Sequence, residues 1–106
     1  MATMLVVRGR DAFSALSRHG RRVREGPLTV VHRDGPDPAR VAFSVSRRVG
    51  PSVVRNRLRR RLRALWRDLD APTGDYLIIT APPAADLGFA ELGDALRAAM
   101  ARLEPV

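Results

Sequence analysis

The side chains best suited to chemistry in this chain are the arginines between Asp37 and Asp68, an interval that holds no acidic residue. A guanidinium group stays charged at physiological pH, and its planar fork of N–H donors suits phosphate groups and the faces of bases. A cluster of such groups without nearby carboxylates predicts a binding surface for a polyanion. The ten arginines are Arg40, Arg47, Arg48, Arg55, Arg57, Arg59, Arg60, Arg61, Arg63 and Arg67.

The positive charge of the protein comes from this one segment. Residues 1–39 carry seven arginines and four acids, a charge of +3. Residues 40–67 carry ten arginines and no acid, a charge of +10, whereas residues 68–106 carry two arginines and seven acids, a charge of −5. Evenly scattered charge would say little about partners. This asymmetry instead marks one surface for a polyanion and leaves the C-terminal end as ordinary solvated surface.

A helix is expected to hold these arginines, because apolar residues recur at helical spacing through the same segment. Gly50 and Pro51 interrupt the chain, and the helix is expected over residues 53–69. Its buried stripe is Val54, Leu58, Leu62, Leu65 and Leu69. Arginines recur at every fourth position on another side: Arg55, Arg59, Arg63 and Arg67. Like charges at that spacing destabilise an isolated helix by roughly 0.2–0.5 kcal/mol per pair, a cost that a bound polyanion offsets.

The rest of the chain supplies a sheet for this helix to pack on. Runs of β-branched and apolar residues between turn residues predict four strands, and two further segments have helical periodicity. The expected strands cover residues 22–26, 28–32, 40–46 and 76–81, and the expected helices cover 11–19, 53–69 and 89–103. The order α-β-β-β-α-β-α predicts one α+β domain over residues 1–106. We expect a two-layer sandwich, with a four-stranded sheet that packs its helices on one face.

Aliphatic residues are expected to fill the core, because aromatic residues make up only 5% of the chain. In the first helix, Phe13 and Leu16 are expected to face inward. Trp66 is expected to pack at the end of the basic helix. The inward residues of the last helix are expected to be Phe89, Leu92, Leu96, Met100 and Leu103.

Composition argues against several functional classes. The chain has no cysteine, and therefore no disulfide, zinc finger or thiol nucleophile. No stretch approaches the roughly 18–20 apolar residues of a membrane-spanning helix, and a cytoplasmic protein is expected. The two histidines, His19 and His32, are expected at the ends of a helix and a strand, and the carboxylates are dispersed without metal-ligand spacing. Acid–base catalysis by the protein itself is therefore not expected.

One stretch closely resembles the signature of the protein subunit of bacterial ribonuclease P: residues 44–63, SVSRRVGPSVVRNRLRRRLR. The residues from Phe43 to Gly50 match the strand and turn of that signature, and Arg55-Asn56-Arg57 match its central triplet. The similarity extends into the first helix and the last strand, so that it covers nearly the whole chain.

This resemblance implies a fold with a left-handed crossover around the basic helix, against the usual right-handed rule. It implies a subunit that binds a catalytic RNA and the 5′ leader of precursor tRNA and promotes endonucleolytic 5′ maturation of tRNA. The chemistry is then done by the RNA, with Mg²⁺ held mainly by that RNA. The chain alone is expected to be non-catalytic and to hold no metal. The implied partners are ribonuclease P RNA and precursor tRNA, with no membrane and no protein partner.

The resemblance also assigns residues to two surfaces. Contact with the leader, in a cleft between the first helix and the sheet, falls to Phe13 and Phe43. The chain departs from the family at Ser17 and Val31, where further aromatic residues are usual, and its basic amino-terminal tail is short. Leader binding should therefore be weaker or rest more on guanidinium and backbone contacts. Contact with the catalytic RNA falls to Arg47, Arg48, Arg55, Asn56, Arg57, Arg59, Arg60 and Arg63.

Two other functions stay open at this point. A ribosome-associated protein of similar fold would bind RNA and have no role in cleavage. A protein nuclease that acts alone would need an acid–base or metal constellation, which the sequence does not display. Cleavage assays with and without the RNA separate these alternatives.

Overall fold

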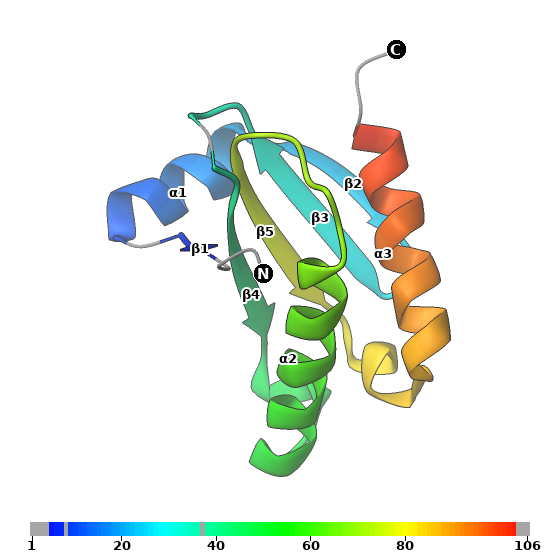
Figure 1. Ribbon diagram of the computed structural model, residues 1–106. Coiled ribbons are helices and arrows are strands. Elements are labelled where there is room, and N and C mark those ends of the chain that lie inside the picture. Colours follow the sequence, from blue (N-terminus) through cyan, green and yellow to red (C-terminus); the bar gives the residue numbers. More distant parts are fainter. Residues whose placement is uncertain (1–4, 8, 37, 104–106) are drawn as a thin grey trace.

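The computed structural model describes residues 5–7, 9–36 and 38–103, and Figure 1 shows the arrangement of its elements. Every helix and strand expected from the sequence is present, with ends no more than two residues from those expected. The elements are β1 (Leu5–Val6), α1 (Arg10–His19), β2 (Arg21–Glu25), β3 (Leu28–Arg33), β4 (Arg40–Val45), the 3-10 helix η1 (Arg47–Val49), α2 (Ser52–Arg67), β5 (Asp75–Thr80), the 3-10 helix η2 (Pro82–Asp86) and α3 (Phe89–Leu103).

The strands form one mixed sheet in the order β1-β4-β5-β3-β2. β4 and β5 are parallel neighbours, whereas β3 runs antiparallel to both β5 and β2. The four expected strands make up the body of the sheet, and the two-residue strand β1 extends it beyond β4. The α+β class and the element order are therefore confirmed, with β1 as an addition at the edge.

The connection from β4 through α2 to β5 is a left-handed crossover. In Figure 1 both strands run downward, α2 lies in front of the sheet, and β5 lies to the right of β4. A right-handed connection would place β5 on the other side of β4. The hand implied by the family resemblance is confirmed, and α2 contacts β4 from the front of the sheet in Figure 1.

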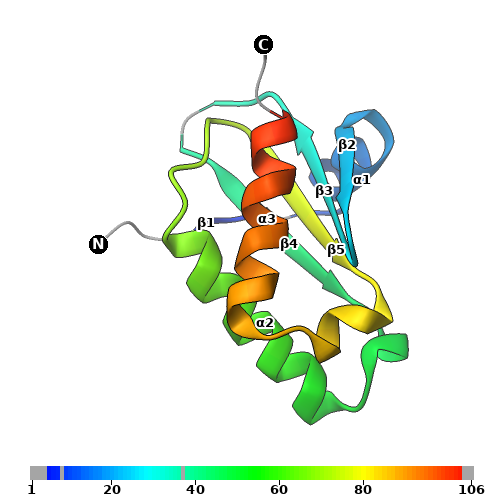
Figure 2. The same ribbon diagram turned by 90° about the vertical axis from the view of Figure 1, so that its right-hand side faces the viewer.

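The helices lie on both faces of the sheet, so the expectation that all of them share one face was wrong. Figure 2 shows α1 on one side of the sheet and α2 with α3 on the other. Leu16 of α1 packs against Val31, Ala42 and Leu77, in a cluster separate from the main core. The main core lies between the opposite face and the other two helices.

The physical reason is that the central strands are apolar on both faces. Val30 and Val31 are adjacent in β3 and both are fully buried, and Leu77 and Ile78 repeat this pattern in β5. Successive side chains of a strand point to opposite faces, so each face needs its own cover. The near-continuous apolar run of β5 carried this signal in the sequence.

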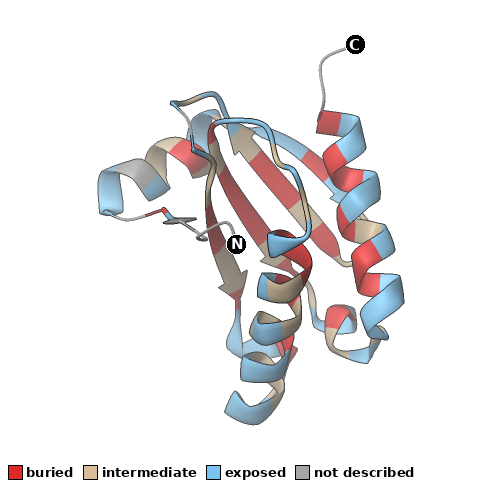
Figure 3. Cartoon of the chain, in the orientation of Figure 1, coloured by how far each residue is buried: buried red, intermediate tan, exposed pale blue. Residues whose placement is uncertain are grey.

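The apolar stripe expected on α2 is confirmed. Figure 3 shows buried residues on the side of α2 that meets the sheet and exposed residues on its outer side. Leu58, Leu62 and Leu65 are buried, and Trp66 is buried with its ring edge against Tyr76 at a centroid distance of 5.0 Å. The helix is therefore held firmly against the sheet along its length.

The last helix, α3, packs beside α2, and its first residue differs from expectation. Gly93 is buried there, and a Cβ atom at this position would lie 2.9 Å from Leu65 Cδ2, so the glycine permits close approach of α3 to α2. Phe89 was expected to face inward, but it lies 46% exposed at the start of α3. The other inward residues of this helix are buried as expected, from Leu92 to Leu103, so only Phe89, the first residue of α3, lies outside the core.

Replacement of Gly74 by alanine should destabilise the fold. Gly74 precedes β5 with a φ angle of +119°, and a Cβ atom there would lie 2.5 Å from the carbonyl oxygen of Arg33. We expect the backbone conformation alone to cost about 1–3 kcal/mol of unfolding free energy in Gly74→Ala. Urea denaturation measures this loss. Gly35→Ala is the matched control, because its Cβ would meet no atom closer than 3.4 Å. Equal midpoints for the two variants would contradict the prediction.

Candidate nucleic-acid interface

The eight residues expected to contact RNA lie together on η1 and α2, which follow one another along one side of the molecule. Val49 is buried and anchors η1 to the core, so the exposed side chains of this short helix are held in place. Arg55 and Arg59 are half-buried. The exposed members are Arg47, Arg48, Asn56, Arg57, Arg60 and Arg63.

None of these arginines is paired with a carboxylate among the residues that the structure describes. The ion pairs found there join Arg40 to Asp75, Arg97 to Asp94 and Arg102 to Glu25. Unpaired guanidinium groups keep their donors available for phosphate oxygens. The surface is therefore electropositive as folded, as the charge distribution of the sequence predicted.

Arg40 is the one arginine of the 40–67 segment that a carboxylate neutralises in the described structure. Its Nε and Nη2 atoms donate to the two carboxylate oxygens of Asp75 at 2.8 and 2.7 Å, which joins β4 to β5. The hydrogen bond to Asp75 and then its negative charge raise the pKa of the Arg40 guanidinium above the ordinary value. Arg40 therefore belongs to the sheet and not to the binding surface.

Backbone carbonyls orient the two half-buried arginines. Arg55 Nε donates to the Gly50 carbonyl oxygen at 3.1 Å, and Arg59 Nη2 donates to the Val45 carbonyl oxygen at 3.5 Å. These contacts tie α2 to the turn that follows β4. Each guanidinium has five N–H donors, so several stay free for a ligand. The side chains are thus partly ordered before any partner binds, which lowers the entropic cost of binding.

The polar neighbours of these arginines complete the arrangement. Arg55 Nη2 donates to Ser52 Oγ at 3.1 Å, and Arg59 Nη1 donates to Asn56 Oδ1 at 3.3 Å. The bond to Asn56 fixes its side-chain oxygen and leaves its amide N–H groups as donors. Asn56 therefore works with Arg59 as an uncharged donor beside a charged one.

Two further arginines of α2 were not assigned to the interface from the sequence. Arg67 is exposed and continues the row of arginines at every fourth position that starts at Arg55. This spacing could have identified Arg67 as part of the interface. It also lies in the last turn of α2, where a cation interacts favourably with the helix dipole. Arg61 differs, because its Nη1 atom donates to the Leu87 carbonyl oxygen at 3.3 Å and joins α2 to the segment before α3.

The two residues expected to form the leader cleft lie on opposite faces of the sheet. Phe13 was expected to face inward, but it is 41% exposed on α1. Phe43 is half-buried and packs against the main core, on the face that α2 and α3 cover. Its assignment to a cleft beside α1 was therefore wrong. The reason is strand alternation, because Phe43 shares the face of Val41 and Val45, which pack under α2.

The α1 side of the sheet is only partly covered. Thr29, Ile79 and Ser44 are paired across β3, β5 and β4, and all three are half-buried. Arg24 pairs with Thr29 at the β2 edge and is exposed. The neighbouring row, which contains Leu77, is buried beneath α1. These residues form an uncovered sheet row beside α1, which the sequence could not indicate because the register comes from long-range pairing.

The described carboxylates and histidines do not suit a protein-held metal ion. Among residues 5–7, 9–36 and 38–103, no three of these side chains come together in a group that could hold one. No helix in those ranges is long and apolar enough to cross a bilayer.

Sequence comparisons identify the family of the chain. A family model described as Ribonuclease P matches residues 1–104. The chain is 42% identical over 106 residues to the ribonuclease P protein component of Thermobifida fusca, covering 89% of this chain and 72% of the relative. It is 39% identical over 93 residues to the corresponding protein of Shouchella clausii, covering 83% of this chain and 76% of the relative.

Solved structures show the same fold. The ribonuclease P protein of Staphylococcus aureus superposes with a TM-score of 0.87 at 20% identity, covering 96% of this chain and 97% of that chain. The ribonuclease P protein of Thermotoga maritima superposes with a TM-score of 0.84 at 24% identity, covering 94% of this chain and 98% of that chain. At these identities the likeness concerns the fold.

Proposed function

This chain belongs to the bacterial ribonuclease P protein family, and from that membership we propose a division of its surface between two RNA strands. As a subunit of ribonuclease P, it has the ribonuclease P RNA as its partner. The surface of η1 and α2 binds that RNA. The α1 side of the sheet binds the 5′ leader of precursor tRNA in the cytoplasm. The subunit thereby promotes cleavage at the 5′ end of the tRNA.

The observation that carries this proposal is the row of unneutralised arginines on a rigidly packed helix. Each phosphate that an arginine contacts releases condensed counterions, which favours binding and makes it sensitive to salt. The narrow major groove of an RNA helix admits few side chains, so recognition rests on phosphates, 2′-hydroxyl groups and shape. A convex helical surface with fixed guanidinium groups suits that task.

The leader strand is assigned to Phe13 and the uncovered row of the sheet. Phe13 presents an exposed ring on which a base can stack, and stacking is tolerant of sequence. Ile79 and Thr29 supply a half-buried floor, and Arg24 places a cation at the edge of that floor. Because Phe43 lies on the other face, Phe13 is the only aromatic residue in this assignment.

Hydrolysis of the phosphodiester bond is assigned to the partner RNA with its own Mg²⁺. The protein neutralises charge between the RNA strands and positions the leader. Lower repulsion between the strands should reduce the concentration of Mg²⁺ that cleavage needs.

Reconstitution with a bacterial ribonuclease P RNA tests the proposal. At low Mg²⁺, the purified chain should restore removal of the leader from precursor tRNA. Tight binding of the RNA with no gain in cleavage would instead favour a ribosome-associated function. Cleavage by the protein without the RNA would favour a protein nuclease.

Phe13→Ala tests the leader assignment. The loss of one stacking platform should weaken binding of precursor tRNA to the holoenzyme by about fivefold or more, because stacking contributes about 1–3 kcal/mol per base. Binding of mature tRNA, which lacks the leader, should be unchanged. Equilibrium binding assays with the two RNAs measure the difference. Phe89→Ala is the control, since Phe89 has a similar exposure on the distant helix α3. Equal losses of affinity for the two RNAs would indicate that Phe13 has a packing role and does not contact the leader.

A further inference from the structure

A pocket of about 490 Å³ opens at the end of the sheet opposite to the start of α2. In Figure 1 it belongs to the upper end of the molecule, where α1, β3 and α3 finish, whereas α2 begins at the lower end. It is therefore separate from the surface of η1 and α2, and from the uncovered sheet row beside α1. The lining residues are His19, Arg21, His32, Arg33, Asp34 and Leu103.

The lining is rich in hydrogen-bond donors and in positive charge. Two guanidinium groups and two imidazole rings meet there with a single carboxylate, that of Asp34. Both histidines of the chain are in this lining. They come together because β2 and β3 form a hairpin, in which Arg21, two residues after the last residue of α1, is paired with His32. Charged donors converging on one space suit an anion with several acceptor oxygens.

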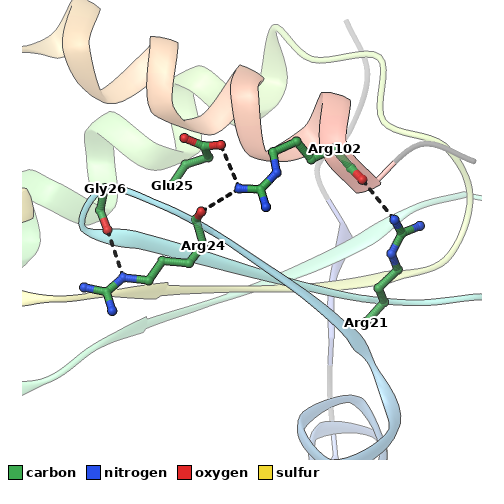
Figure 4. Close-up of polar contacts among 5 residues, drawn as sticks. All are labelled: Arg21, Arg24, Glu25, Gly26 and Arg102. Carbon is green, nitrogen blue, oxygen red and sulfur yellow. Dashed lines mark hydrogen bonds and ion pairs between the residues drawn. The ribbon is translucent and has the colours of Figure 1, made fainter.

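One wall of the pocket is fixed by contacts to the end of α3. Arg21 donates from Nη1 to the Leu103 carbonyl oxygen and from Nη2 to the Arg102 carbonyl oxygen, both at 3.1 Å. Arg102 in turn donates to the Arg24 carbonyl oxygen and to Glu25 Oε1, both at 2.9 Å. Figure 4 shows these side chains crossing between α3 and β2. Arg21 is held in position with part of its donor set still free.

The neighbouring part of the lining is fixed by a ring contact. The His32 ring stacks on Tyr76 with a centroid distance of 4.4 Å and an interplanar angle of 25°. His32 Nε2 lies 3.0 Å from the Thr73 carbonyl oxygen, which can only accept, so Nε2 carries the hydrogen. In contrast, the Arg33 and His19 side chains are exposed, and neither makes a hydrogen bond or ion pair within the described residues. They are the groups most available to a ligand.

We propose that this pocket binds the phosphate group of a nucleotide, carried either by an RNA strand or by a free nucleotide. Fixed and free guanidinium donors meet phosphate oxygens in the geometry that such groups favour. The volume lies within the roughly 300–1,000 Å³ typical of small-molecule sites, so it leaves room for the sugar and base beside the phosphate. The site would hold a phosphate at a distance from both the basic helix and the uncovered sheet row beside α1.

Titration of the full chain with adenosine monophosphate tests this site. Arg33→Gln and His19→Ala should each weaken binding by about tenfold, because the first removes a charged donor to the phosphate and the second removes the imidazole donor. Arg18→Gln is the matched control, since Arg18 is also exposed and lies on α1 next to His19, but does not line the pocket. All three positions are exposed, so the variants should fold, as circular dichroism can verify. Isothermal calorimetry gives the affinities.

Two ligands beside adenosine monophosphate complete the experiment. Adenosine lacks the phosphate and should bind at least about tenfold more weakly. A short oligoribonucleotide identifies the source of the phosphate: its binding weakens in Arg33→Gln if the pocket takes an RNA strand, and stays unchanged if the pocket takes a free nucleotide. Equal binding of adenosine and adenosine monophosphate, or an equal loss in Arg18→Gln, would overturn the proposal. Neither outcome would affect the cleavage assay that tests the proposed function.

Discussion

Replacement of Arg57, Arg60 and Arg63 together by alanine is expected to lower the affinity of the chain for ribonuclease P RNA by roughly 100-fold. The estimate takes about 1 kcal/mol for each hydrogen bond to a phosphate, less than the roughly 1.5–3 kcal/mol usual for charged groups, because these groups are exposed. None of the three has an intramolecular polar partner in the described structure, so the loss reports contact with the RNA. Filter binding or fluorescence anisotropy measures the affinity.

The salt dependence of the same variant gives an independent measurement. The slope of log affinity against log salt should become shallower by about 0.7–0.9 for each lost phosphate contact, or roughly 2–3 in total. An unchanged slope would mean that these arginines do not contact phosphates. The helix itself should persist, because removal of like charges from one helix relieves their mutual repulsion. Circular dichroism checks that point.

A control variant separates local placement from net charge. Arg10, Arg18 and Arg97 are also exposed but lie on α1 and α3, so their replacement by alanine removes the same charge from other surfaces. We expect this control to lose less than about fivefold in affinity, through weaker long-range attraction alone. If both triple variants lost affinity equally, RNA binding would depend on overall charge, and the interface assigned to η1 and α2 would be wrong.

The elements of this fold could be predicted because their signals are local. The apolar stripe of α2, the turn at Gly50 and the β-branched strands each lie within a short window, and each was found close to its expected ends. The exposure of the arginines followed from the same stripe, because residues between the buried positions of an amphipathic helix face solvent. The part of the candidate site on α2 could therefore be predicted from the sequence.

The features that were missed depend on pairing between distant segments. The placement of α1 on the second face required both faces of β3 and β5 to be buried, which Val30 and Val31 signalled only as an apolar run. Phe43 was assigned to the cleft by resemblance, although its alternation with Val41 and Val45 indicated the covered face. Where alternation and resemblance disagreed, alternation was correct.

The pocket at the end of the sheet could not be predicted from the sequence for the same reason, because it depends on pairing between distant segments. Its two histidines are thirteen positions apart, and neither has a motif around it. Only the hairpin of β2 and β3, together with the return of α3 to this end of the sheet, brings His19 and His32 to one space. A binding site built from three elements in this way has no signature at any single spacing.

The proposed RNA surface requires that the core hold α2 rigidly on the sheet. Leu62→Ala tests this requirement. Leu62 is fully buried in the core that joins α2 to the sheet, on the side of the helix that carries no charge. We expect a loss of about 2–5 kcal/mol in unfolding free energy, from the transfer of the missing atoms and the cavity left behind. Urea denaturation followed by circular dichroism measures the loss. Val53→Ala is the control, because Val53 lies on the same helix but is 74% exposed.

The RNA affinity of Leu62→Ala shows whether the packing of α2 affects only the stability of the fold or also the contact with the RNA. Below its melting temperature the variant should bind ribonuclease P RNA within about threefold of the original chain, because the arginines that release counterions are unchanged. Above that temperature binding should fall together with helicity, since the arginines are then no longer held on one surface. If the variant remained folded but lost affinity, α2 would have to shift on the sheet, and the fixed orientation of Arg55 and Arg59 by backbone carbonyls would be part of RNA recognition. If affinity persisted after the helix had melted, charge density alone would bind the RNA and the folded surface would have no role.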